Sequence, residues 1–184
     1  MASRVPRRVR SGRAAAGLVL LLAGASACER VLPPERDPGA LDTAQSLPLA
    51  TDTVRDQVLA ELEQYYADFS ARDWEHFADH FWPGATLTTV WQPPADSTVR
   101  VVATTVPEFV AQAPLGPGSR EIFEERMTSA HVFGHATLVL AWARYSARFG
   151  NPGSIEEWTG ADAFTLLKHE GRWRIVALAW RQDP

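Results

Sequence analysis

The feature that most limits the fold is a change of hydrophobic period along the chain. Residues 51–73, TDTVRDQVLAELEQYYADFSARD, place apolar side chains three and four residues apart, which predicts an amphipathic helix. Asp52 or Thr53 is expected to cap its start. A second, shorter helix is expected over 73–82, DWEHFADHFW, and Pro83-Gly84 ends it. A pure helical bundle is nevertheless excluded, because the period beyond this point falls to two.

The rest of the chain reads as strands with one short helix. Strands are expected over 85–91 and 98–104, a helix over 106–113, and four further strands over 120–133, 135–149, 157–169 and 172–181. The order is therefore two helices, two strands, one helix and four strands. Helices segregated from a sheet define an α+β class. We expect a mostly antiparallel, curved sheet wrapped around the N-terminal helices as a cone with an inner cavity.

The N-terminus has the composition of a secretory signal. Five arginines and no acid precede a short apolar run that ends in small residues, so residues 1–27 are predicted to be a signal peptide. The run is too short to span a bilayer as a helix, although an uncleaved membrane anchor is the alternative. The segment Ala25–Cys28 resembles a bacterial lipobox, which implies cleavage before Cys28 and lipid attachment to it. Ala25 departs from the leucine that the lipobox prefers.

Export is expected on either interpretation of this leader. Lipidation of Cys28 anchors the protein to a membrane of the cell envelope, whereas cleavage after Ala27 leaves it soluble in the periplasm or secreted. Cys28 is the only cysteine, so it cannot form an internal disulfide. Residues 28–51 contain Pro, Gly and polar residues without a period and are predicted to be a flexible linker. The folded domain is expected over 52–184.

The charge of the exported chain excludes one class of partner. Loss of the five leader arginines reduces Lys+Arg from 18 to 13 against 22 Asp+Glu, a formal net charge of −9. Binding to nucleic acid requires a basic face, so nucleic acid is excluded as a partner.

Two segments resemble the nuclear-transport-factor-2-like superfamily, also called SnoaL-like. The first is YYADFSARDWEHFADHFWPGATLTTVW, and the second is the closing hairpin FTLLKHEGRWRIVALAW. The resemblance covers about 52–181 and implies a cone-shaped α+β barrel. It implies little about activity, because the superfamily includes isomerases, dehydratases, cyclases, transport factors and pocket proteins of unknown activity.

The resemblance extends to ketosteroid isomerase, which uses a helix tyrosine and two strand aspartates. Tyr65 falls at the tyrosine position, Thr89 at the position of the base, and Ala163 at that of the second donor. Trp180 matches an aromatic residue that lines the cavity. A threonine hydroxyl has too high a pKa to act as a base near pH 7, so steroid-type isomerisation is disfavoured. Asp162 is expected to face away from the cavity, because neighbouring residues of a strand face opposite ways.

An aromatic pocket for a small apolar molecule is the main functional prediction. Its predicted lining is Tyr65, Phe69, Leu87, Thr89, Trp91, Trp142, Ala163 and Trp180. Three alternatives stay open: the rings fill the cone as core, Tyr65 serves a cavity enzyme of isomerase, dehydratase or cyclase type with an unrecognised acid or His, or the sheet face forms a homodimer.

No cofactor or metal is expected. The chain has no Gly-rich phosphate loop. His76 and His80 have the helical spacing of zinc ligands, but they lie opposite the apolar stripe and are interpreted as a solvated face. His131 and His135 share that spacing across a turn expected at Gly134, where it has no geometric meaning.

Overall fold

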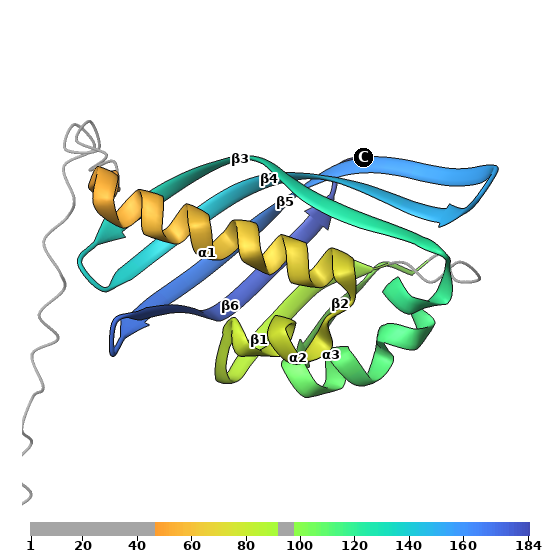
Figure 1. Ribbon diagram of the computed structural model, residues 1–184, viewed down its shortest axis with the longest axis horizontal. Coiled ribbons are helices and arrows are strands. Elements are labelled where there is room, and N and C mark those ends of the chain that lie inside the picture. Colours follow the sequence, from red (N-terminus) through yellow and green to blue (C-terminus); the bar gives the residue numbers. More distant parts are fainter. Residues whose placement is uncertain (1–46, 92–97) are drawn as a thin grey trace, which may run out of the picture. The chain divides into compact units, whose positions relative to one another are not determined.

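A computed structural model describes residues 47–91 and 98–184 (Figure 1). These residues belong to one compact unit, Gln45–Pro184. The predicted signal peptide, Cys28 and most of the predicted linker lie outside the described residues, and so does the side chain of Trp91.

Local sequence explains where the first two helices begin and end. Helix α1 spans Asp52–Ala71, and the Thr51 hydroxyl accepts a hydrogen bond from the Val54 amide at 3.5 Å. The cap is therefore Thr51 and not Asp52 or Thr53. The helix ends at Arg72, whose left-handed backbone (φ 58°) reverses the chain. Helix α2 spans Trp74–Asp79, and the Asp73 carboxylate caps it by accepting from the His76 amide at 3.2 Å.

The strands confirm the expected order of elements. Their bounds are β1 Phe81–Trp91, β2 Arg100–Thr105, β3 Ile122–His135, β4 Leu138–Asn151, β5 Ser154–His169 and β6 Arg172–Gln182. Helix α3, Val106–Gln112, starts with a capping box between Thr105 and Glu108, and the 3-10 turns η2 (Ala113–Leu115) and η3 (Pro117–Ser119) follow it. Gly134 lies within β3, so His131 and His135 are on one strand and not on either side of a turn.

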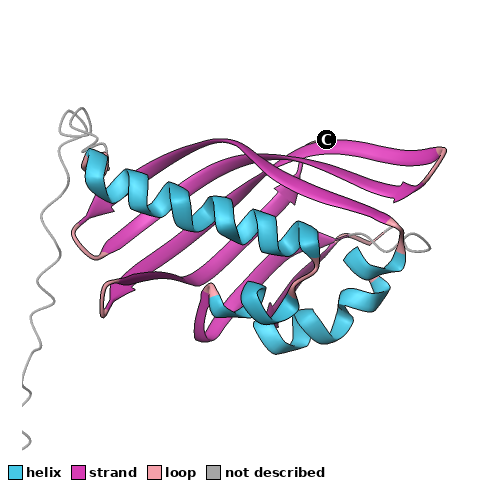
Figure 2. Cartoon of the chain, viewed as in Figure 1, coloured by secondary structure: helices cyan, strands magenta, loops and turns pink. Residues whose placement is uncertain are grey.

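One six-stranded sheet has the order β2-β1-β6-β5-β4-β3, in which only β1 and β6 pair in parallel. The sheet is curved, and α1 lies across one of its faces (Figure 2). The α+β class and the mostly antiparallel sheet agree with the sequence-based expectation. The edge strand β3 runs beside α1, which brings helix and strand side chains together along a groove.

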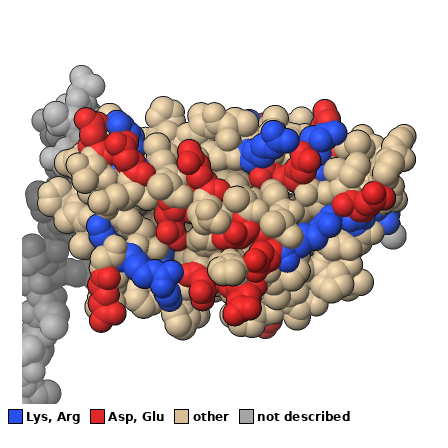
Figure 3. Space-filling model, viewed as in Figure 1, with Lys and Arg blue, Asp and Glu red and all other residues tan. Residues whose placement is uncertain are grey.

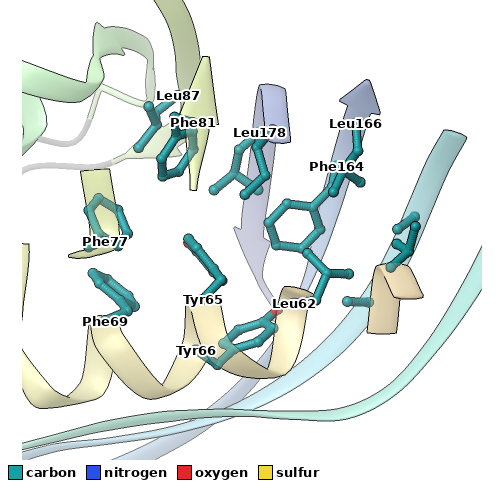
Figure 4. Close-up of a cluster of buried hydrophobic side chains, with 14 of the residues drawn as sticks. Leu62, Tyr65, Tyr66, Phe69, Phe77, Phe81, Leu87, Phe164, Leu166 and Leu178 are labelled. Carbon is teal, nitrogen blue, oxygen red and sulfur yellow. The ribbon is translucent and has the colours of Figure 1, made fainter. Parts of the chain in front are cut away.

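Aromatic rings fill the space between α1, α2 and the sheet (Figure 4). Phe77 is completely buried and stacks on Phe69 with ring centroids 5.2 Å apart. Tyr65 contacts Phe164 edge-on at 5.4 Å and Phe81 at 5.9 Å. Full burial of one such side chain stabilises the fold by about 1.5–3 kcal/mol. These rings fill much of the interior of the cone, so the space between α1, α2 and the sheet is hydrophobic core.

The opposite face of the sheet is not covered by the described part of the chain. Trp142 is 50% exposed there, with Leu138 and Leu140 on the same face of β4. Ala163 is the β5 partner of Trp142 and lies on this outer face too. The expectation that Trp142 and Ala163 point into the cone is therefore wrong. The strand alternation places Ala141, Ala143 and Tyr145 inward instead.

Candidate functional site

Strand β5 presents an acid to the interior. Asp162, Phe164 and Leu166 alternate along it and are all buried beneath α1, with Asp162 only 2% exposed. The sequence-based orientation of Asp162 is thus reversed, because it is the even-numbered residues of β5 that face the helix. Burial of a carboxylate is costly unless it gains a partner. The buried Asp162 is therefore taken as the first residue of the candidate functional site.

The partner of Asp162 is Tyr66, the neighbour of the predicted Tyr65. The Tyr66 hydroxyl donates a short hydrogen bond to Asp162 Oδ2, and Tyr66 is 2% exposed. Successive helical residues are about 100° apart around the axis. Tyr65 accordingly points into the aromatic core, as its ring shows in Figure 4, while the Tyr66 hydroxyl reaches Asp162.

A pocket of about 370 Å³ lies between α1 and β3 next to this pair. Its lining is Glu63, Tyr66, Ala67, Ser70, Glu124, Glu125, Arg126 and Met127. Ser70 Oγ holds the strand to the helix, because it donates to the Glu125 carbonyl and accepts from the Glu125 amide, both at 2.8 Å. Acidic side chains predominate around α1 on the face shown in Figure 3. The pocket is therefore lined by three glutamates, Glu63, Glu124 and Glu125, unlike the predicted aromatic one.

Burial shifts the ionisation of both carboxyl groups upward. It raises the pKa of Asp162 to about 7, against the hydrogen bond from Tyr66, which favours the ionised form. Burial raises the pKa of Glu125 well above its ordinary value, and the charge of Asp162 adds to this. The pKa values of Tyr65, Tyr66 and Tyr145 are raised as well, by burial first and then by these carboxylates. The phenols remain neutral, so the two carboxyls are the groups that can exchange protons.

The residues predicted to bind a ligand do not gather around this pocket. Tyr65, Phe69 and Leu87 are core residues. The Thr89 hydroxyl donates to the Trp180 carbonyl at 2.9 Å, so it is engaged by the backbone. The Trp180 ring is partly buried and meets the Phe109 ring edge-on at 6.2 Å. Ligand binding by this set remains a prediction, whereas Tyr66, Glu125 and Asp162 are the polar groups that the sequence-based site omitted.

A second polar cluster involves His80, which is 7% exposed and not on a solvated face. Its Nδ1 lies 2.7 Å from Glu61 Oε1 and its Nε2 lies 2.9 Å from Asp68 Oδ2. With a carboxylate at each nitrogen, the charged imidazolium satisfies both contacts. Its pKa is raised, because these contacts with Glu61 and Asp68 outweigh the desolvation that lowers it. His76 is exposed and pairs with Asp73.

Neither cluster has the arrangement of a metal centre. Within residues 47–91 and 98–184, no group of three or more His, Cys, Asp or Glu side chains could hold a metal ion. In the same residues, no helix is both long and apolar enough to cross a membrane.

The chain has the cystatin-like, nuclear-transport-factor-2-like α+β fold. A cystatin-like protein of unknown function from Nostoc punctiforme matches with a TM-score of 0.59 and 11% identity, covering 74% of this chain and 96% of that chain. A candidate dehydratase of the NTF2-like family from Streptomyces avermitilis matches with a TM-score of 0.58 and 14% identity over 72% and 98% of the chains.

The same fold also occurs in a subunit of a larger enzyme. The β subunit of benzoate 1,2-dioxygenase from Burkholderia mallei matches with a TM-score of 0.54 and 7% identity, over 68% of this chain and 88% of that chain. No protein-family model matches the sequence. No curated protein matches it either. At these identities the likeness defines the fold alone.

Proposed function

We propose that the domain binds a small molecule in the pocket between α1 and β3 and exchanges a proton with it at Glu125. The observation that carries this proposal is the buried Tyr66–Asp162 hydrogen bond beside Glu125 at the pocket wall. Buried carboxyls with strongly raised pKa values beside a pocket are typical of functional sites. The ligand has a polar group that meets Glu125 and an apolar part that meets Met127 and Ala67.

The chemistry that fits this pair is general acid–base chemistry. A carboxyl that keeps its proton near pH 7 can donate it to a ligand, and a neighbour that titrates near pH 7 can adjust the charge around it. Glu125 lines the pocket and is the acid, whereas Asp162 lies behind Tyr66 and positions it. Proton-transfer reactions of the isomerase, dehydratase or cyclase type need such groups. The fold of the candidate dehydratase from Streptomyces avermitilis supports this choice by analogy.

An NMR fragment screen tests the binding proposal. Small molecules with one polar group and an apolar ring are added to ¹⁵N-labelled protein at pH 7. We expect amide shifts of Ser70 and of residues 124–127, and loss of these shifts in Glu125→Gln. Glu75→Gln makes the same substitution at an exposed position on α2 and is the matched control. Shifts confined to other surfaces, or equal losses in the two variants, refute the proposal.

A second function, dimerisation through the outer sheet face, is favoured by Trp142. An indole 50% exposed next to Leu138 and Leu140 is a large apolar surface, of the kind that marks protein interfaces. We propose that a second copy covers this face. Trp142→Glu is then expected to convert a dimer into a folded monomer in analytical ultracentrifugation. Glu157→Gln, at an exposed position of β5, serves as the control. A wild-type monomer at micromolar concentration refutes the dimer.

We also propose that the protein is exported and is anchored in the cell envelope by lipid on Cys28. The arginine-rich, apolar leader and the lipobox-like segment before Cys28 support this. Cys28→Ala is expected to move the protein from the membrane fraction to the soluble fraction. Unchanged membrane retention contradicts the anchor, and a soluble wild-type protein supports release after Ala27.

A further inference from the structure

We infer that the ligand of the Glu125 pocket is a small organic cation, an ammonium group carried on an apolar body. This inference rests on the proposed binding function of the pocket and adds the charge of its ligand. It depends on which charges in and behind the pocket already have a partner, and on where the remaining ones point.

The cations near the pocket are already paired. Arg126 lines it, and its guanidinium bonds Glu124 Oε2 at 2.8 Å. Arg148 reaches the same oxygen at 3.2 Å and also bonds Glu157 at 2.9 Å. Among the described residues, no arginine, lysine or histidine contributes to the ionisation of Glu125 or Asp162. Within residues 47–91 and 98–184 these two carboxyls therefore have no basic partner.

Glu125 is the carboxyl that a ligand can reach. Its main chain is fixed by Ser70 on both the amide and the carbonyl side. Glu125 is half-buried and forms part of the pocket wall, and its carboxyl has no hydrogen-bond partner among the described side chains. An ammonium group placed at this wall would supply that partner.

The remaining lining suits the body of such a ligand. Ala67 and Met127 are apolar, and the Tyr66 ring offers a face that attracts cations. A volume of about 370 Å³ lies near the lower end for small-molecule sites, so the ligand is small. A carboxylate or phosphate ligand is disfavoured, because the only arginine of the lining, Arg126, is already paired with Glu124, and Glu63 adds a negative charge.

Binding of a cation displaces protons from the carboxyl pair. Both pKa values are raised, so the pair holds protons at neutral pH that an ammonium group would replace. Release of one proton makes affinity rise about tenfold per pH unit while the carboxyl is protonated in the free protein. A neutral ligand has no such dependence, because it does not exchange charge with the pair.

Three probes of similar shape and different charge test the inference: benzylammonium, benzyl alcohol and benzoate. Isothermal titration calorimetry between pH 6 and pH 8, in two buffers of different ionisation enthalpy, gives affinity and proton release together. We expect benzylammonium to bind with rising affinity and release of up to about one proton per ligand. Benzyl alcohol should bind more weakly without pH dependence, and benzoate should not bind. Glu125→Gln should abolish the pH dependence, and Glu75→Gln should retain it.

The outcomes separate this inference from the binding function. If benzyl alcohol binds at this pocket as tightly as benzylammonium at pH 8, the cation preference is wrong while the binding function survives. Benzoate binding overturns the preference as well. If none of the three probes binds, the inference fails with them, and the fragment screen by NMR then decides the binding function by itself. Thermal unfolding of Glu125→Gln checks that the variant is folded, as expected because glutamine keeps the shape of the protonated carboxyl.

Discussion

Replacement of Asp162 by Asn should make the protein more stable at high pH and leave it nearly unchanged at low pH. Asn keeps an oxygen that accepts the Tyr66 hydrogen bond but cannot ionise. In the folded protein the pKa of Asp162 is raised from 3.8 to about 7, so the folded state binds its proton more tightly than the unfolded chain does. Ionisation therefore destabilises the fold progressively as the pH rises from about 4 to about 7.

The size of the effect follows from that shift. A difference of about three pH units, at about 1.4 kcal/mol for each, gives about 4 kcal/mol in the free energy of unfolding above pH 7. Asp162 is 2% exposed, so solvent does not reduce this value much. The gain shrinks as the pH falls and vanishes below about pH 4, where Asp162 is protonated in both states.

Urea unfolding at pH 4, 6 and 8 measures the difference between variant and wild type. With a urea dependence of about 2 kcal/mol per molar, the midpoint of Asp162→Asn should exceed that of the wild type by about 2 M at pH 8. The exposed Asp79→Asn serves as the control and should follow the wild type at each pH. Parallel wild-type and Asp162→Asn curves across this range would refute a buried, proton-binding Asp162.

Three further changes test other parts of the structure. A Cβ at Gly160 would lie 2.3 Å from the Tyr145 ring, so Gly160→Ala should displace that ring and cost about 1–3 kcal/mol in urea unfolding. His80→Gln should destabilise more at pH 5 than at pH 9: the raised pKa of His80 contributes stability that is complete below its unfolded value and is lost as the pH rises through the folded value. Thermal unfolding at both pH values checks this, and equal losses would contradict it. Phe77→Ala should cost about 3–5 kcal/mol by leaving a cavity in the aromatic core, measured by calorimetry.

The order of the elements was predictable because hydrophobic periodicity and helix-ending or turn-forming residues act locally. The stripe that includes Val58, Leu62 and Phe69 needs only helix geometry to be recognised, and the same residues are buried in the structure. The start of α1 differed by one or two residues, since Thr51, Asp52 and Thr53 all have cap-forming side chains and only the chain path selects among them. The outer Trp142 shows the limit of composition, because aromatic character does not tell which face of a strand a helix will cover.

The candidate site was harder to predict because it depends on which residues of a strand face a helix that is far away in the chain. The resemblance to ketosteroid isomerase placed the Ala163 side chain inward. A shift of one residue in such a comparison turns every side chain of a strand to the opposite face of the sheet. The buried row Phe164 and Leu166 was a usable signal, since its parity also includes Asp162. Glu125 gave no such signal. Its neighbour Glu124 is also acidic, and a bulge interrupts the β3–β4 register between Met127 and Ser129.

The energetic cost of burying Asp162 beside the pocket favours a functional role for this residue. A domain that needed only stability would place Asn or Leu at position 162, since removal of the ionisable group is expected to gain about 4 kcal/mol above pH 7. That is a large part of the 5–15 kcal/mol by which a domain is stable. The core around Phe77 is apolar and well packed, and the penalty falls beside the wall that Glu125 and Tyr66 share with a pocket. A ligand that neutralises these carboxyls would recover part of that free energy on binding, which is why the charge of the probe should decide its affinity.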